Sequence, residues 1–173
     1  MPHKNLAVEL LNKLLKDEIR IISKKNVVKG RSFLKLLEQS MRAYQNRSIE
    51  TAKVIEQLIE LAKEIRDADR RGEDLGLTED ELAFYDALET NDSAVKVLGD
   101  DVLRTIALDL VDTIRKNVSI DWTERESIKA KFRVKVKRIL RKHGYPPDKQ
   151  KKATETMLQQ AESLAGDWMF LTT

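Results

Sequence analysis

Few side chains in this sequence have the spacing that catalysis or metal binding requires, although the chain contains 29 Asp or Glu residues. There are no cysteines, and the two histidines, His3 and His143, lie far apart with no second ligand at zinc-binding spacing. Acidic residues gather in residues 67–74, but without the spacing of an EF-hand. We interpret that acidic segment as solvated charge, and His143 as a residue that favours the C-terminal end of a helix dipole. The sequence therefore predicts no catalytic residue and no metal site.

Nucleotide-binding motifs are also missing from the sequence. A phosphate-binding loop needs the pattern Gly-x-x-x-x-Gly-Lys-Ser/Thr, because its backbone amides and its lysine hold the phosphates. None of the six glycines lies in such a pattern. We therefore expect no cofactor and no small-molecule substrate, and we expect that the chain is not itself an enzyme.

The strongest chemical feature is positive charge concentrated in one segment. Residues 123–152 contain 12 Lys or Arg and 3 Asp or Glu, a net charge of +9, whereas the whole chain has a net charge of +3. Clustered cations bind phosphate groups or acidic protein surfaces. The candidate partner-binding or DNA-binding residues are Lys129, Lys131, Arg133, Val134, Lys135, Lys137, Arg138, Arg141 and Lys142.

Three interpretations of this basic segment are open. A helix face rich in Lys and Arg is commonly only solvated. Val134, an apolar residue among the charged positions, instead indicates contact with a partner, either DNA phosphate or an acidic protein surface. No aromatic residue interleaves the cations, which argues against single-stranded nucleic acid. The lack of a helix-turn-helix pattern argues against sequence-specific reading of DNA.

A helix must position these basic residues. Thr123 and Glu126 have the spacing of a capping box, which predicts a helix that begins just after Thr123. Gly144 is placed to end this helix in the left-handed conformation, and residues 145–147, Tyr-Pro-Pro, predict an extended link. The expected apolar face comprises Ile128, Phe132, Val136, Ile139 and Leu140.

A second helix is expected after this link. Asp148 is predicted to cap it. Its expected buried residues are Ala153, Met157, Leu158, Ala161 and Leu164.

Helical periodicity also organises the first half of the chain. We predict a helix from Asn5, its cap, to Lys25, a second helix capped by Ser32, a third over residues 49–71, and an exposed loop at residues 67–76. The expected buried residues are Leu6, Leu10, Leu11, Leu14, Leu15, Ile19 and Ile22 in the first helix, Phe33, Leu36, Leu37, Met41 and Tyr44 in the second, and Ala52, Ile55, Leu58, Ile59, Ala62 and Ile65 in the third.

The sequence pattern in the middle of the chain predicts shorter helices. Thr78 and Glu81 form a second capping box, followed by a helix with Leu82, Tyr85 and Leu88 inward. A short helix is expected around residues 94–98. Another is expected from Asp100 or Asp101, with Val102, Leu103, Ile106, Leu110 and Ile114 inward. Residues 117–122 are the only strand candidate. The predicted fold is all-α, a single-domain bundle of about seven or eight helices.

One long stretch resembles a known family. Residues 121–162, DWTERESIKAKFRVKVKRILRKHGYPPDKQKKATETMLQQAE, resemble the C-terminal helical domain of the restriction (R) subunit of type I restriction-modification enzymes. Residues 75–88, LGLTEDELAFYDAL, and residues 6–19, LAVELLNKLLKDEI, resemble the same family, in the same order. The most specific signature residues are Asp121, Trp122, Thr123, Gly144, Tyr145, Pro146 and Pro147.

This resemblance implies that residues 1–173 are a fragment of a longer chain whose nuclease and ATP-driven motor lie elsewhere. The domain would attach the R subunit to a methyltransferase core of modification and specificity subunits, within a complex that translocates and cuts DNA. Nucleases of that family need an Asp and an acidic-x-Lys pair, and no Lys here follows Asp or Glu by two residues. The fragment is expected to be non-catalytic, although its parent resembles an ATP-dependent type I site-specific deoxyribonuclease. A nonspecific DNA-phosphate-binding helical module, with duplex DNA as its partner, is the alternative.

No segment of the sequence indicates a membrane partner. No apolar run approaches the ~20 residues that span a bilayer. Residues 1–4 lack the apolar core of a signal peptide. We therefore expect a cytoplasmic protein.

Overall fold

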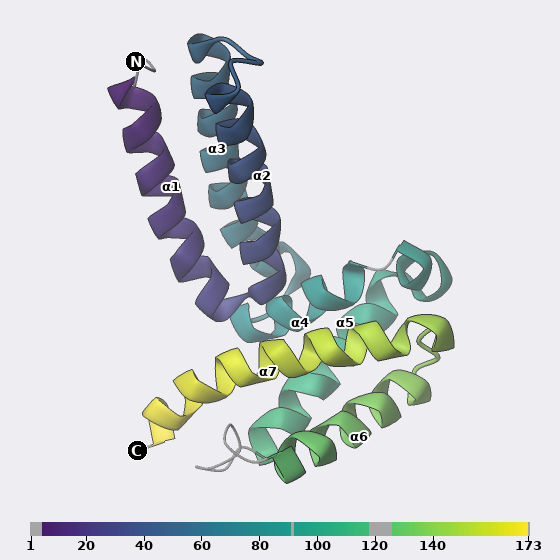
Figure 1. Ribbon diagram of the computed structural model, residues 1–173. Helices are drawn as coiled ribbons and strands as arrows, with labels where there is room; N and C mark the ends of the chain where they lie inside the picture. Colours follow the sequence, from purple (N-terminus) through teal and green to yellow (C-terminus); the bar gives the residue numbers. More distant parts are fainter. Residues whose placement is uncertain (1–4, 91, 118–125, 173) are drawn as a thin grey trace. The chain divides into compact units, whose positions relative to one another are not determined.

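The computed structural model describes residues 5–90, 92–117 and 126–172 of the chain. Over these residues it contains seven α-helices, one 3₁₀ helix and no strand (Figure 1). The predicted all-α class and number of helices are thus confirmed. The chain divides into two compact units, one of Met1–Lys24 with Val28–Gly76 and one of Lys25–Val27 with Leu77–Thr173.

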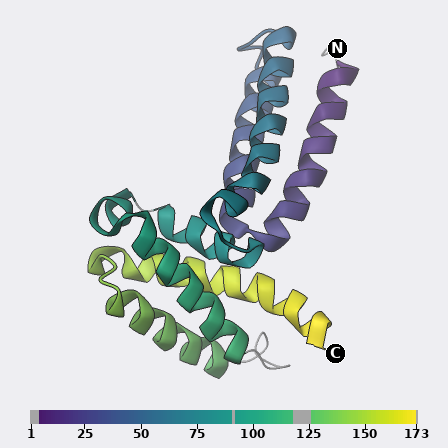
Figure 2. The same cartoon turned by 180° about the vertical axis from the view of Figure 1, so that it is seen from behind.

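Three long helices form the first unit. They are α1 (Leu6–Lys25), α2 (Val27–Gln45) and α3 (Thr51–Leu75). Figures 1 and 2 show α2 and α3 side by side along their length. Their shared apolar core comprises Val8, Leu15, Ile19, Phe33, Leu37, Val54, Leu58, Leu61 and Ile65. Most neighbouring core positions within a helix are three, four or seven residues apart, because that spacing keeps side chains on one face.

Local geometry sets the ends of these three helices. Asn5 Oδ1 accepts hydrogen bonds from the backbone N–H groups of Ala7 (2.9 Å) and Val8 (3.3 Å), which confirms the predicted cap. The turn after α2 places Arg47 at φ 54°, and α3 is followed by Gly76 at φ 66°. This left-handed conformation lets N–H groups beyond the helix reach its last carbonyls.

The predicted cap at Ser32 is wrong, because α2 already begins at Val27 and only Asn26 separates it from α1. Residues 25–27 belong to the second unit, where Gln160 binds them. The buried Gln160 side chain accepts a hydrogen bond from the Val27 N–H (2.8 Å) and donates one to the Lys25 carbonyl (2.7 Å). These two bonds satisfy backbone groups at the point where the helix is interrupted.

α3 runs through the segment that was expected to be a loop. The prediction of an exposed loop at residues 67–76 is wrong, because the helix continues to Leu75 and only Gly76 leaves it. Arg and Glu are good helix formers, so a charged composition does not exclude a helix. The segment contributes little to the core, which is why the apolar pattern stops before the helix does.

Several residues that were predicted to be buried are exposed instead. They are Leu6, Leu10 and Leu14 of α1, Leu36 of α2, and Ala52 and Ile59 of α3. Val8, Val54 and Leu61 lie in the core. The reason is that these helices carry apolar residues on more than one face, so periodicity alone does not identify the face that packs. The remaining predicted residues of this unit lie in the core or pack against it.

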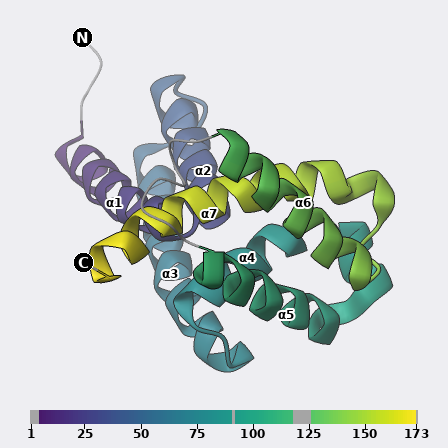
Figure 3. The ribbon, with the colours of Figure 1, turned by 90° about the horizontal axis from the view of Figure 1, so that it is seen from below.

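Four α-helices form most of the second unit: α4 (Glu79–Glu89), α5 (Asp92–Asn117), α6 (Glu126–Lys142) and α7 (Gln150–Thr172). Both α4 and α6 pack against α5 and α7, and Figure 3 shows this group from below. Its buried apolar residues include Phe84, Tyr85, Leu88, Leu103, Ile106, Leu110, Ile114, Phe132, Val136, Leu140, Met157 and Leu164.

The start of α4 and the interruption of α5 follow the sequence prediction. Thr78 Oγ1 accepts from the Glu81 N–H (3.2 Å), while Glu81 Oε1 accepts from the Thr78 N–H (2.8 Å), which confirms the capping box. α5 is interrupted at Gly99 (φ 78°, ψ 170°), so a short helix precedes a longer one as predicted. The strand candidate at residues 117–122 starts at the last residue of α5, and residues 118–122 lie outside the described part of the chain.

Candidate interaction surface on helix α6

Four apolar side chains fix the orientation of α6. Phe132, Val136, Ile139 and Leu140 are buried as predicted, where α6 packs against α5 and α7. Because they lie one, three or four residues apart, they occupy one side of the helix. The basic residues of the same helix therefore occupy its edges and its outer side.

Two of the candidate basic residues form ion pairs with α7. Lys129 Nζ lies 2.6 Å from Glu162 Oε1, and Arg133 Nε donates to Glu155 Oε1 at 3.1 Å. All four side chains are partly exposed to solvent, so each pair contributes ~1 kcal/mol or less. Lys129 and Arg133 thus have partners within the fold, and they help to hold α6 against α7.

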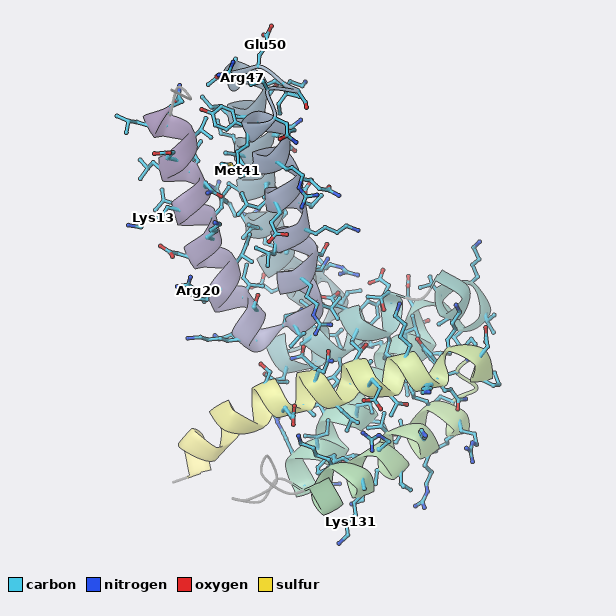
Figure 4. All side chains as sticks on the ribbon, viewed as in Figure 1. Lys13, Arg20, Met41, Arg47, Glu50 and Lys131 are labelled. Carbon is cyan, nitrogen blue, oxygen red and sulfur yellow. The ribbon has the colours of Figure 1, made fainter. Side chains whose placement is uncertain are left out.

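Five of the candidate residues form an exposed row, which we call the α6 ridge: Lys131, Val134, Arg138, Arg141 and Lys142. Their spacing of three, four, three and one residues keeps them on one side of the helix. Val134 exposes 56% of its surface among these cations. Figure 4 shows Lys131 pointing away from the ribbon. Lys135 and Lys137 are half-buried beside the ridge.

The charge of α6 determines what the ridge can bind. The helix contains eight Lys or Arg residues and one Glu. Attraction between exposed charges extends over ~10 Å at 0.1 M salt. The ridge can therefore attract phosphate or carboxylate groups. Protonated Lys and Arg side chains are hydrogen-bond donors only, so the ridge supplies no general base.

The signature residues 144–147 build the turn after α6. Gly144 has φ 78°, as predicted, and the Tyr145 N–H donates to the Leu140 carbonyl at 2.9 Å. The Tyr145 side chain is buried, and its hydroxyl donates to the Leu88 carbonyl of α4 at 3.2 Å. This tyrosine therefore connects the end of α6 to the core of the second unit.

The start of α7 differs from the prediction. Pro146 is extended (φ −52°, ψ 125°), as expected, but residues Pro147–Lys149 form a 3₁₀ helix, η1. Asp148 lies inside η1, so its prediction as a helix cap is wrong. Proline has no N–H to satisfy, and Pro147 can therefore open the helical turn one residue earlier. The predicted buried residues of α7 are confirmed: Ala153, Met157, Leu158, Ala161 and Leu164.

Three predicted signature residues, Asp121, Trp122 and Thr123, lie outside the described residues, and so does the helix start predicted at Thr123.

His143 contacts a neighbouring helix at the end of α6. Its Nε2 lies 3.3 Å from Asp109 Oδ2 on α5.

Across residues 5–90, 92–117 and 126–172, no group of three or more His, Cys, Asp or Glu side chains is placed to hold a metal ion. None of the helices in these ranges has an apolar stretch that could cross a membrane.

An apolar row on α1 was not predicted as a surface feature. Leu6, Leu10 and Leu14 are exposed, and Ile21 is exposed further along the helix. The signal was present in the sequence as a second set of apolar residues at helical spacing, offset from Val8 and its core neighbours. A helix with two apolar faces presents more apolar surface than its own unit can bury.

Comparison with known proteins identifies relatives of this chain. Residues 1–167 match the family described as type I restriction enzyme HindI endonuclease subunit-like, C-terminal. The type I restriction enzyme HindI endonuclease subunit of Haemophilus influenzae is 37% identical over 166 residues, 96% of this chain and 16% of that protein. A putative type I restriction enzyme MjaIXP endonuclease subunit of Methanocaldococcus jannaschii is 35% identical over 143 residues, 82% of this chain and 14% of that protein.

The chain thus spans less than a fifth of the length of these curated relatives. No solved structure matches it at a significant level. The family match covers the first unit, the second unit up to residue 167 and the whole of α6. The chain belongs to the family of C-terminal regions of type I restriction enzyme endonuclease subunits.

Proposed function

We propose that this chain is a non-catalytic docking region. It would attach the endonuclease subunit of a type I restriction enzyme to a methyltransferase core made of modification and specificity subunits. The α6 ridge carries the proposal, because it presents cations and a valine that the fold leaves exposed. The similarity to endonuclease subunits supports a place in a multi-subunit enzyme. The intact enzyme, rather than this region, would use ATP, translocate DNA and cut it.

Val134 favours a protein partner over DNA. Protein interfaces combine an apolar centre with a polar rim. Burying an exposed valine against apolar atoms contributes ~1.5 kcal/mol, whereas a DNA backbone offers phosphates and sugars instead. The four cations around Val134 would pair with acidic side chains of the partner and steer its approach.

A pull-down with purified methyltransferase core, made without DNA, tests this function. The triple variant Lys131→Glu, Arg138→Glu and Lys142→Glu should capture at least about tenfold less core, because attraction becomes repulsion at three positions. The matched control reverses the charge at three exposed positions of the first unit, Lys35→Glu, Arg42→Glu and Lys63→Glu. It should bind the core as the wild type does. Circular dichroism should show both variants folded, since all six side chains are exposed.

The density of cations on α6 favours a second candidate, a nonspecific DNA-phosphate-binding helical module. Its binding to unrelated duplexes should fall steeply with salt, because each neutralised phosphate releases counterions. The triple variant should then flatten this salt dependence. Val134→Ala separates the candidates, since it should weaken capture of the core and leave DNA binding unchanged. Normal capture and normal DNA binding by the triple variant would contradict both and leave the α6 ridge as a solvated face.

A further inference from the structure

Helix α1 is apolar on two nearly opposite sides. One side, with Val8, Leu15 and Ile19, belongs to the core of the first unit. On the other side the exposed fractions are 82% for Leu6, 59% for Leu10, 55% for Leu14 and 56% for Ile21. At ~100° per residue these four positions fall within about 80° of one another, and their centre lies about 150° from that of the buried side.

A row of this kind is unlike the scattered apolar residues of an ordinary surface. A single exposed leucine needs no explanation, whereas a contiguous exposed patch marks an interaction site. Helices that are apolar on one side only are the rule at a surface. The outer side of α1 is therefore suited to being covered by another helix.

Two opposite charges lie between Leu10 and Ile21 of this row, and a further cation, Lys24, follows Ile21 on the same side of α1. Lys13 and Asp17 are both exposed, and both fall on the side of α1 that carries the exposed leucines. Figure 4 shows Lys13 pointing outward from α1, away from α2 and α3. We call the complete set the α1 row: Leu6, Leu10, Lys13, Leu14, Asp17 and Ile21.

The charges of the α1 row restrict what can cover it. Between Leu10 and Ile21 the row carries one cation and one anion, four residues apart, and this pair matches neither a uniformly acidic nor a uniformly basic partner surface. They do match the same row running in the opposite direction, because reversal places each charge beside its opposite. The row is thus complementary to a second copy of itself.

We propose that the α1 row is a self-association surface on which two copies of this chain pair through antiparallel α1 helices. In this register Lys13 of each protomer faces the partner's Asp17. The same register brings Leu10 beside the partner's Ile21, and the two copies of Leu14 meet near the two-fold axis. Such a contact is isologous, so one patch serves both protomers.

The expected dimer is weak and depends on protein concentration. α1 has 20 residues and is ~30 Å long, so a single helix pair lies at the small end of interface sizes. The α1 row lies in the first unit and the α6 ridge in the second. The inference therefore stands independently of the docking function proposed above.

Analytical ultracentrifugation of the 173-residue chain over a concentration series tests the proposal. A monomer–dimer equilibrium is expected for the wild type. Leu14→Ala should raise the dissociation constant at least about tenfold, because two leucine side chains leave the interface while the helix propensity is kept. The matched control Leu34→Ala truncates an exposed leucine of α2 and should leave the dissociation constant unchanged. A chain that is monomeric at every concentration would overturn the proposal.

Charge exchange tests the antiparallel register. Lys13→Glu alone and Asp17→Lys alone should each weaken the dimer by about threefold to tenfold, because like charges then face each other twice. The double variant Lys13→Glu with Asp17→Lys should restore the wild-type constant to within about threefold. Lys16→Glu, an equal charge change one turn away and outside the row, is the control and should have no effect. A double variant as weak as the single variants would show that a different surface or register covers α1, and would refute the self-pairing.

Discussion

At the scale of single residues, the side-chain carbonyl of Asn12 in α1 is the least well hydrogen-bonded of the buried side-chain groups described. Its Oδ1 is buried and has no hydrogen-bond partner among the described residues. A buried acceptor without a partner costs ~1–3 kcal/mol relative to one that is hydrated. The first unit therefore carries a local defect that a single substitution can remove.

Asn12→Ala should raise the free energy of unfolding by about 1 kcal/mol. The substitution removes the unsatisfied carbonyl, and alanine is a better helix former than asparagine. Urea denaturation followed by circular dichroism measures the change as a shift of the midpoint. The isosteric control Asn12→Asp should lower the midpoint, because it places a charge where no donor is available. An alanine variant no more stable than the wild type would contradict the expectation.

Residue-scale features with local causes could be predicted from the sequence. The Asn5 cap, the capping box of Thr78 and Glu81, and the left-handed Gly144 each act within about one helical turn, so neighbouring residues suffice to identify them. Gln160 binds the backbone of Val27 across 133 positions of sequence, and no local pattern reveals such a contact. The early start of α2 could not be predicted for this reason.

At the scale of elements, prediction succeeded for helices with one apolar face and failed for helices with two. Apart from Val134, α6 has its large apolar residues on one side and cations elsewhere, so its buried face follows from spacing alone. α1 has two apolar rows, and the choice between them depends on α2 and α3, which the α1 sequence does not encode. α3 extends beyond its last core residue, Ile65, to Leu75, and only Gly76 marks its end.

The junction between α6 and α7 gives a prediction at this scale. Gly144→Val should lower the free energy of unfolding by about 1 kcal/mol or more, because a β-branched residue resists the left-handed conformation at φ 78°. An added Cβ would meet only the Leu98 side chain, at 3.8 Å, so the cost is backbone strain rather than a clash. The midpoint temperature of thermal unfolding, compared between the wild type and the variant, measures this change in stability.

A substitution that tolerates this conformation provides the control. Asn adopts left-handed geometry more readily than other non-glycine residues, so Gly144→Asn should cost less than Gly144→Val. Equal midpoints for the wild type and the valine variant would mean that Gly144 does not need a positive φ in solution.

At the scale of the whole molecule, two exposed surfaces belong to two different compact units. The α1 row lies in the first unit and the α6 ridge in the second. The concentration of cations in α6 could be predicted because it is a property of the sequence itself, whereas the five ridge residues could not be told apart from the other four candidates. The grouping of helices into units could not, because periodicity identifies the face of a helix but not the helix that covers it.

The chemistry of the whole chain gives the last prediction. The purified 173-residue chain should neither hydrolyse ATP nor cut duplex DNA in the presence of magnesium. The sequence has no phosphate-binding loop, which ATP hydrolysis by a motor requires, and no acidic-x-Lys pair of the kind a metal-dependent nuclease uses. Phosphate release and plasmid cleavage measure the two activities, with a full-length type I restriction enzyme as the positive control. Metal-dependent cleavage that copurifies with the chain, and that a substitution in the chain abolishes, would falsify the non-catalytic assignment.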